Sequence, residues 1–344
     1  MTFDPLAFDP GLTAVRGLEV GHAERTERPT GCTVILARRG AIAGVDVRGG
    51  APGSRELALL DPVQTVQRVH AVMLAGGSAF GLEAAGGVMR YLESQGIGFK
   101  TGAGAVPIVP ASILYDLEVG GRSDVRPDAA CGERAARAAQ GGPVAEGSVG
   151  AGAGASVGKI AGHGAAMRGG LGSASWRLDG GATVAALIAV NAFGDVIDPA
   201  TGEVVAGTRD ARGGLADARR VIYERGRAAG GAGQNTTIGV VATDAALTKA
   251  QTTKLAVMAQ DGLARCLYPA HTPFDGDTLY ALATGEHDAE DDDEDGGGDR
   301  DAEALGILGA VAADLVVRAV LRAVHRARGL PDLPALGDAP VPPR

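Results

Sequence analysis

Aromatic residues are scarce in this chain of 344 residues, where Phe, Trp and Tyr together account for 3% and Trp occurs once. The chain is nevertheless 45% apolar, which excludes an intrinsically disordered protein. Its 55 glycines follow no Gly-X-Y period, which excludes a collagen-like chain. With few large rings to fill a core, we expect strands and helices to pack with their backbones close together. The length alone permits one large domain or two smaller ones.

Cysteine is also rare. Cys32, Cys131 and Cys266 are odd in number, lie far apart in the sequence and form no C-x-x-C pair. This pattern argues against a disulfide framework or a zinc knuckle and favours a reducing compartment, so we expect a cytoplasmic protein. No basic region followed by an apolar run stands at the start, so no secretory signal is visible. The most apolar segment, Ala304 to Val317, is interrupted by Asp314 and falls short of a membrane span.

An excess of basic charge is absent as well, because the net charge is −9. Residues 286–303 hold eleven acidic side chains against one Arg, so this tract accounts for −10 and leaves about +1 for the rest. Without a basic footprint, nucleic acid and anionic membranes are not expected as partners. Like charges in the tract repel one another, so we expect a disordered surface loop there, with metal binding as the alternative.

Apolar strand-like segments alternate with longer segments of helical pattern. The expected strands are residues 12–15, 32–36, 41–47, 69–74, 182–190 and 236–241. The expected helices are residues 78–94, 128–139, 247–267 and about 302–328. This alternation is compatible with an α/β fold.

The most informative stretch runs from Gly230 to Asp244, where a loop of small residues enters a β-branched strand. Thr236 stands at this junction. If the bond between Asn235 and Thr236 were cut, Thr236 would carry a hydroxyl nucleophile and an α-amine of pKa about 7.7 to 8.0, which suits a general base. Nucleophile and base would then be one residue. The alternative is that Thr236 only begins a strand, as β-branched residues often do.

This junction carries a resemblance to a known family. The run Gln234 to Ile238, followed by Val240 to Asp244, resembles the self-cleavage junction of the DmpA/NylC family, which is peptidase family S58. The Gly-Gly-Ser-Ala-Phe-Gly block from Gly76 to Gly81 resembles a core signature of the same family, and the likeness covers roughly residues 10 to 330. The resemblance implies that an internal Ser or Thr cleaves its own precursor and becomes the N-terminal nucleophile.

The resemblance also implies an architecture. The family fold is a four-layer α-β-β-α sandwich, so we expect residues 1–344 to form a single catalytic domain. Self-cleavage would divide it into two chains, 1–235 and 236–344. No cofactor and no metal are implied. A homo-oligomer, by family likeness a tetramer, is the expected assembly.

The implied mechanism assigns roles to particular residues. The Thr236 hydroxyl attacks the Asn235 carbonyl, hydrolysis of the ester frees the enzyme, and the same hydroxyl then attacks a substrate amide. Asn191, which could otherwise only start a turn, is implied as the amide donor of an oxyanion hole. Asp275 and Asp277 are implied to orient the Thr236 amine. From the residues alone, that pair could also be a turn or part of a calcium loop, although a calcium loop needs more oxygen ligands.

Tyr115 and Lys159 complete the implied pocket. Tyr115 lies in an Ile-Leu-Tyr-Asp context that resembles the family, and its alternative is a core residue with a satisfied hydroxyl. A phosphate loop around Lys159 is disfavoured, because Ala153 stands where the first Gly is needed and Ile160 follows the lysine. The resemblance instead implies a glycine-rich strand and turn from which Lys159 points into the site.

Two other residues could be taken for catalytic groups. Ser78 is disfavoured as a nucleophile elbow, because Gly76-x-Ser78-x-Phe80 lacks the final Gly of G-x-S-x-G, and we expect it to cap a helix. His22 could be a base, but no Ser or Cys partner motif accompanies it, so we expect a structural histidine at a strand end.

The predicted function is therefore a self-processing amide hydrolase with a Thr nucleophile. The Asn-Thr junction and the Asp-x-Asp pair resemble most the branch of the family that hydrolyses 6-aminohexanoate (nylon) oligomers. We therefore expect such linear amide oligomers, or small peptides, as substrates. The alternatives are an aminopeptidase or D-amino-acid amidase-esterase of the same family, a glutamate N-acetyltransferase-like enzyme of related fold, and a non-catalytic binding protein.

Overall fold

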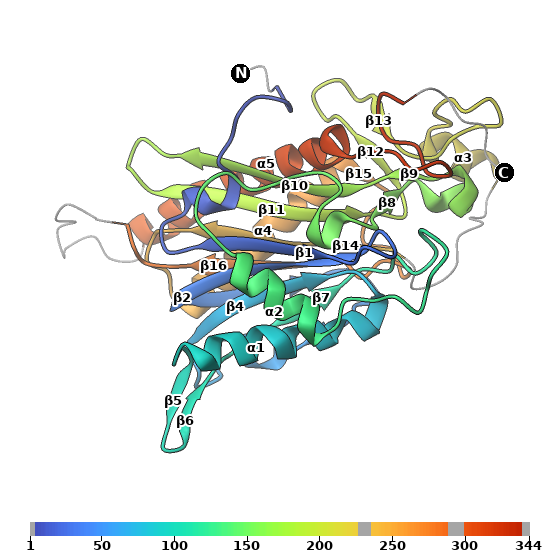
Figure 1. Cartoon of the computed structure of the whole chain (residues 1–344). Coiled ribbons are helices and arrows are strands. Elements are labelled where there is room, and N and C mark those ends of the chain that lie inside the picture. Colours follow the sequence, from blue (N-terminus) through green and yellow to red (C-terminus); the bar gives the residue numbers. More distant parts are fainter. Residues whose placement is uncertain (1–3, 226–234, 288–298, 339–344) are drawn as a thin grey trace.

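The computed structural model describes residues 4–225, 235–287 and 299–338. Figure 1 shows strands stacked between helices, with α1 and α2 on the lower side and α5 on the upper side. The helices are α1 (Ala84–Ser94), α2 (Ala129–Ala138), α3 (Ala218–Arg225), α4 (Lys249–Cys266) and α5 (Asp299–Arg326). Asp128 caps α2 and Thr248 caps α4 through their side chains, which is why these two helices begin where the sequence predicts.

The main sheet has nine strands in the described part of the chain, in the order β10-β11-β14-β16-β2-β4-β7-β3, with β1 paired to β2. Its strands are β1 (Glu19–Glu24), β2 (Gly31–Val47), β3 (Ser54–Arg55), β4 (Arg68–Ala75), β7 (Ala111–Ile113), β10 (Gly170–Arg177), β11 (Thr183–Asn191), β14 (Thr236–Thr243) and β16 (Thr278–Ala283). The smaller sheets contain β5 (Phe99–Thr101), β6 (Gly104–Val106), β8 (Ser156–Val157), β9 (Met167–Arg168), β12 (Asp195–Ile197), β13 (Val204–Ala206) and β15 (Leu267–Tyr268).

Strand β2 belongs to both β layers. Its first half pairs with β1 and β4, its second half pairs with β16, and the β2–β4 register shifts between Leu36 and Ala41. The two segments that the sequence predicts as separate strands, 32–36 and 41–47, are thus one continuous strand. The irregularity at Leu36–Ala41 interrupts the pairing with β4, which resumes at Ala41 and Ile42, where the pairing with β16 begins.

Alternation along β11 shows how the layers are filled. Its even-numbered residues from Val184 to Val190 enter a core shared with α4 and α5, and its odd-numbered residues from Ala185 to Ala189 enter a core shared with β1, β2 and β4. A third core joins β2 and β4 to α1 and α2. Because neighbouring residues of a strand face opposite sides, one strand serves two cores. These three cores separate four layers, so the expected α-β-β-α sandwich is confirmed.

Glycine permits close contact between the layers. A Cβ at Gly172 on β10 would overlap the main-chain carbonyl of Ala319 on α5. A Cβ at Gly132 on α2 would overlap the carbonyl of Ala84 on α1. The aromatic-poor, glycine-rich composition therefore corresponds to backbone packed closely on backbone, as the sequence predicts.

Two local predictions are wrong. Residues 12–15 do not form a strand, because a 3-10 turn occupies Gly11–Ala14 and places Leu12 and Val15 together in the core. Ser78 does not cap a helix: it opens a 3-10 segment, Ser78–Glu83, with a φ of 56° and no capping side-chain bond. Helix α1 begins only at Ala84, because the chain first turns through left-handed conformations at the end of β4.

The three cysteines are free thiols and all are buried. Cys32 and Cys131 are distant in sequence, but their sulfur atoms lie 3.6 Å apart in the core between β2 and α2. Cys266 lies in the other helix–sheet core. Burial raises the pKa of the Cys266 thiol.

Helix α5 begins at Asp299, so the last residues of the acidic tract are helical, while residues 288–298 lie outside the described residues. Within the described residues, Asp301–Arg326 is long and apolar enough to cross a membrane by length and composition, with a mean hydropathy of 2.0 over an 18-residue window, so the expectation that this segment falls short of a span is wrong by these criteria. The helix is nevertheless packed in the fold, where Ala312, Val316 and Val320 join the core with α4 and β11. This packing explains its apolar composition.

Candidate active site

Four strand ends meet at one edge of the sheet. Strands β14 and β16 are parallel neighbours, so their first residues, Thr236 and Thr278, lie at the same edge. Asp275 and Asp277, called the Asp pair below, directly precede β16. Strand β11 is antiparallel to β14, and its last residue, Asn191, pairs with Thr236. The C-terminal end of β2 pairs with the start of β16. Topology therefore brings the predicted nucleophile, carboxylates and amide together.

Thr236 and Asn235 are buried, with 3% and 2% of their surfaces exposed. The Thr236 hydroxyl donates a hydrogen bond to the main-chain carbonyl oxygen of Asn235. The main-chain N–H of Gly276 donates to that same oxygen at 2.9 Å. A Cβ at Gly276 would lie 2.7 Å from the Thr236 hydroxyl oxygen, so a larger residue would press on it. The hydroxyl and the carbonyl of the bond predicted to break are therefore in contact.

The Asp pair forms one side of the site, which we call the carboxylate flank. Asp277 accepts the main-chain N–H of Thr237 at 2.7 Å. Asp275 accepts the hydroxyl of Thr272 at 2.6 Å, its N–H at 3.0 Å, and the N–H of Phe193 at 3.4 Å. Burial, reinforced by the charge of Asp277, raises the pKa of Asp275 to about 6. The carboxylate oxygens are thus occupied by protein donors.

Lys159 and Asn191 form the opposite side, called the lysine flank. The Lys159 ammonium donates to the main-chain oxygen of Asn191 at 3.0 Å and to its side-chain oxygen at 2.9 Å. The same side-chain oxygen accepts the N–H of Ser156 at 3.0 Å, and the Asn191 amide donates to the carbonyl of Tyr115 at 2.9 Å. Burial lowers the pKa of Lys159 to about 7, although the charge of Asp275 opposes the shift. The Asn191 side chain is therefore fixed on both of its atoms.

Tyr115 contacts the lysine flank through its main-chain carbonyl oxygen, which accepts the amide of Asn191. Its side chain is partly buried, and its hydroxyl donates to Glu118 at 3.4 Å. Burial raises the pKa of the phenol. Glu118 also contacts His163 at 3.2 Å, and both residues line a cavity of about 780 Å³ together with Arg209. A substrate-sized cavity thus adjoins Tyr115.

The structure places the two rejected candidates in structural roles. The ring of His22 lies 3.0 Å from the hydroxyl of Thr33, which also accepts the N–H of Ala151. Burial lowers the pKa of His22 to about 4, so the ring is neutral near pH 7. Ser78 donates its main-chain N–H to the carbonyl of Leu114. Within the described residues, no hydrogen bond joins either residue to Thr236.

Sequence reasoning missed several groups that hold the site. Gly276, Thr272 and His271 all contact Thr236, Asn235 or the Asp pair. The N–H groups of Arg48 and Ala51 donate to the main-chain oxygens of the Asp pair. The available signal was proximity in sequence, because Thr272, His271 and Gly276 lie within six residues of Asp277. Main-chain donors leave no mark in the residue types.

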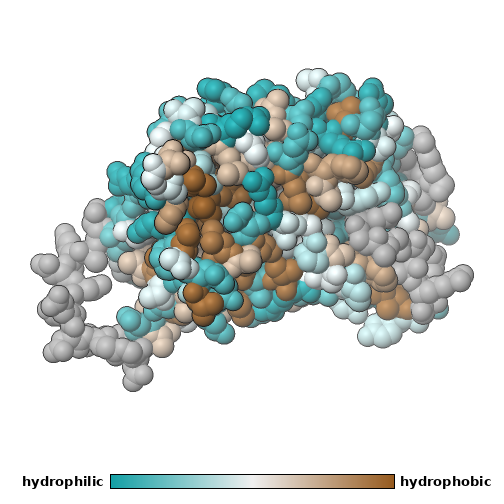
Figure 2. Space-filling model, turned by 90° about the horizontal axis from the view of Figure 1, so that it is seen from below, coloured by the Kyte–Doolittle hydropathy of each residue, from teal (hydrophilic) through white to brown (hydrophobic). Residues whose placement is uncertain are grey.

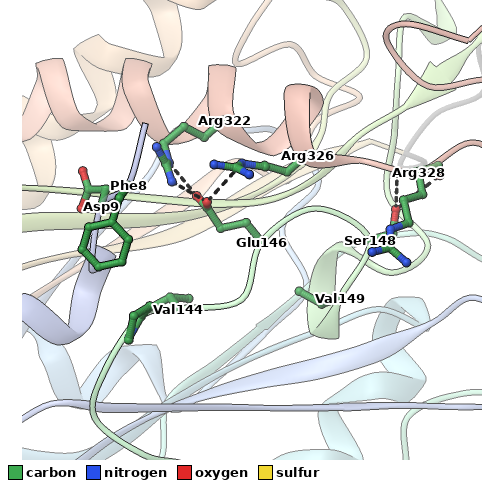
Figure 3. A pocket seen from close by; sticks show the side chains of 10 residues that line it. Phe8, Asp9, Val144, Glu146, Ser148, Val149, Arg322, Arg326 and Arg328 are labelled. Carbon is green, nitrogen blue, oxygen red and sulfur yellow. Dashed lines mark hydrogen bonds and ion pairs between the residues drawn. The ribbon is translucent and has the colours of Figure 1, made fainter. Parts of the chain in front are cut away.

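A second cavity, of about 440 Å³, lies elsewhere (Figure 3). Figure 3 shows Glu146 pointing toward Arg322 and Arg326, which both belong to α5. Arg322 pairs with Glu146 at 2.6 Å and donates to the carbonyl of Ala7 at 2.8 Å. None of the residues that line this cavity is a predicted site residue. This cluster ties the N-terminal segment to α5 and is structural.

Comparison with known proteins identifies the family of this chain. The model of peptidase family S58 matches residues 11–333. An uncharacterized aminopeptidase of Mycobacterium tuberculosis is 42% identical over 342 residues, which cover 95% of this chain and 97% of the relative. A 6-aminohexanoate-oligomer endohydrolase of Paenarthrobacter ureafaciens is 34% identical over 319 residues, which cover 89% of this chain and 84% of that protein.

A solved structure supports the fold. The L-aminopeptidase D-Ala-esterase/amidase of Ochrobactrum anthropi, described as a variant of the Ntn hydrolase fold, superposes with a TM-score of 0.70. The two chains are 21% identical, and the match covers 98% of this chain and 94% of that one. Family match, sequence identity and fold agree over nearly the whole length. The chain therefore belongs to peptidase family S58 and is an amide-bond hydrolase.

Proposed function

We propose that the chain is a self-processing amide hydrolase in which Thr236 becomes an N-terminal nucleophile. The observation that carries this proposal is the contact between the Thr236 hydroxyl and the Asn235 carbonyl, with the Gly276 N–H on the same oxygen. Both residues are buried, so few waters compete for the carbonyl. A threonine that only began a strand would not need this arrangement.

In the self-cleavage step, the Thr236 hydroxyl oxygen attacks the Asn235 carbonyl carbon and its proton passes to the leaving nitrogen. The C–N bond breaks, and an ester joins the Asn235 acyl group to the Thr236 oxygen. The N–H of Gly276 stabilises the negative charge that develops on the carbonyl oxygen. Breaking the C–N bond frees the α-amine of Thr236, and water then hydrolyses the ester, which yields the carboxylate of Asn235 and restores the Thr236 hydroxyl.

In turnover, the α-amine of Thr236 acts as the base for its own hydroxyl. The Asp pair orients this amine, because Asp277 already holds the next residue, Thr237, through its N–H. Asn191 offers its second amide N–H to the tetrahedral intermediate, while Lys159 holds its oxygen. The amine product leaves first, when the substrate acyl group is transferred to the Thr236 oxygen. Water then hydrolyses this ester and releases the acid product.

The substrate class follows from the Asn-Thr junction, the Asp-x-Asp pair and the relatives' names. We propose linear amide oligomers such as 6-aminohexanoate oligomers, or small peptides. The cavity beside Glu118 and His163 would hold the chain. An aminopeptidase is the second candidate, because the relative that is 42% identical carries that name. An oligomer with a blocked N-terminus distinguishes them, since only an endohydrolase cleaves it.

The direct test is the intact mass of purified protein. Two fragments, with a new N-terminus at Thr236-Thr237-Ile238, are expected. A cut elsewhere, or none after long incubation, contradicts the mechanism. A non-catalytic protein would stay a single band on a denaturing gel, and turnover of acetyl-ornithine would instead indicate an acetyltransferase.

We also propose that the chain assembles as a homo-oligomer, with a tetramer expected. Figure 2, seen from the side of α1, shows hydrophobic residues gathered on the surface. Phe80, Phe99 and Val106 are among the exposed large hydrophobic side chains of the described chain. Patches of this kind often mark protein interfaces. Light scattering on the purified protein measures the assembly.

A further inference from the structure

His271 lies in the loop that leads from β15 to the Asp pair. Its side chain is only 18% exposed. The ring Nδ1 lies 3.0 Å from one carboxylate oxygen of Asp277, and the main-chain N–H of His271 donates to that same oxygen at 3.0 Å. The other oxygen of Asp277 accepts the N–H of Thr237. Asp277 is thus held between His271 and the residue that follows Thr236.

The contacts select one tautomer of the ring. An ionised carboxylate only accepts hydrogen bonds, so Nδ1 must carry the proton that points at Asp277. The Nε2 of His271 is buried and has no hydrogen-bond partner among the described residues. A proton there would be an unpaired buried donor, which is costly. A ring that carries its proton on Nδ1 therefore fits these contacts.

The backbone of His271 adopts a left-handed conformation, with a φ of 56°. This conformation is uncommon for a residue with a side chain and persists where surrounding contacts over-determine it. Here it directs both the main-chain N–H and the ring Nδ1 toward one oxygen of Asp277.

We propose that His271 is a positioning residue that fixes the Asp277 carboxylate, and through it the N-terminus that self-cleavage creates at Thr236. This rests on the proposed function and adds to it a residue that acts through Asp277. Without the ring, Asp277 keeps its main-chain donors but loses one side-chain hydrogen bond, so its carboxylate can rotate away from Thr237.

Two substitutions separate the hydrogen bond from the backbone strain. His271→Asn tolerates the left-handed conformation, and its amide can place an N–H near the position of Nδ1. His271→Gly accepts the same backbone without any side chain. We expect His271→Gly to lower kcat by about tenfold or more, with KM nearly unchanged, because a hydrogen bond to a charged group is lost. His271→Asn should recover most of that loss.

The wild-type protein is first checked for a new N-terminus at Thr236, so that failure of the proposed function is recognised separately. If the wild type is cleaved and His271→Gly keeps wild-type kcat, the proposal is wrong. It is equally wrong if the Asn and Gly variants lose activity to the same extent while both remain folded by circular dichroism.

A spectroscopic test does not depend on activity. In ¹⁵N-labelled protein, the His271 ring should show its proton on Nδ1, and Asp277→Asn should shift that signal while the signal of His22 stays in place. A ring protonated on Nε2 in the wild type would overturn the proposal.

Discussion

The two flanks of Thr236 carry opposite charges, yet the pKa of the main charged group on each flank is shifted so that its neutral form is favoured. Burial lowers the pKa of Lys159 to about 7 on the lysine flank and raises the pKa of Asp275 to about 6 on the carboxylate flank. Attraction between the two groups would push both pKa values the other way. Burial is the larger cause for each, so desolvation outweighs attraction here. Two groups whose pKa values lie near 7 and 6 can gain or lose a proton close to neutral pH, which suits proton transfer.

The flanks are also built differently. The lysine flank depends on two side chains from separate segments, because the Lys159 ammonium donates to Asn191 and the Asn191 amide supplies the donor of the site. The carboxylate flank is surrounded by main-chain N–H groups, including those of Thr237, His271 and Thr272. One substitution can therefore empty the lysine flank, whereas the carboxylate flank keeps most of its donors. The following predictions test this difference.

The largest effect is expected at the residue between the flanks. Thr236→Ala should abolish both self-cleavage and turnover, because loss of a nucleophile typically costs on the order of a millionfold in kcat. Thr236→Ser should keep part of each, since it retains the hydroxyl and exposes the same α-amine. Intact mass and amide-oligomer hydrolysis measure the two. Wild-type turnover in the alanine variant would place the nucleophile elsewhere.

Breaking the lysine flank should come next. Asn191→Ala removes the amide donor and leaves Lys159 without its side-chain acceptor, so kcat should fall on the order of a hundredfold or more. Ser156→Ala is the matched control, because Ser156 reaches Asn191 through its main-chain N–H at 3.0 Å and its hydroxyl only at 3.4 Å. If Asn191→Ala lowers Tm but leaves kcat intact, Asn191 has only a structural role.

Breaking the carboxylate flank should cost less. Asp275→Asn should lower the kcat of amide-oligomer hydrolysis about tenfold, because hydrogen bonds to a charged group are weakened. Since the wild-type pKa is about 6, Asp275 gains a proton as pH falls through 6, and the rate should fall in that window. The variant should lose this dependence. Amide-oligomer hydrolysis by the cleaved protein, followed above and below pH 6, provides the measurement.

The same variant separates activity from stability. The raised pKa means that folded Asp275 binds its proton more tightly than unfolded Asp275 between the ordinary value of 3.8 and about 6. Above pH 6 the ionised group therefore destabilises the fold. Asp275→Asn should consequently be slower but no less stable at pH 8. A lower Tm there would show that its hydrogen bonds matter more than its burial.

The smallest effect is expected from the acidic tract. Deleting residues 288–298, which lie outside the described residues, should leave self-cleavage and kcat near wild type, because the donors and acceptors found at the two flanks belong to other parts of the chain. Loss of both activities with an unchanged circular dichroism spectrum would contradict this expectation.

Strand and helix patterns could be predicted because they depend on local periodicity. Strand β11 and helices α2 and α4 lie where the residue types predict them. Thr236 could be placed at the start of a strand because small residues precede it and a β-branched run follows it. The short segment 12–15 was predicted wrongly, because four apolar-rich residues fit a strand or a helical turn equally well. The prediction of Ser78 as a cap overlooked the left-handed turn that precedes α1.

The sequence by itself determined the nucleophile candidate, the carboxylates beside β16 and the close-packed character of the core. Each of these features depends on residue types that can be read directly from the chain. The tertiary structure alone decided that Lys159 holds Asn191, that the Gly276 N–H meets the Asn235 carbonyl, and that His271 faces Asp277. The physical reason is topology. Parallel pairing of β14 with β16 and antiparallel pairing with β11 bring three strand ends to one edge, and the donors there are mainly backbone groups that every residue type shares.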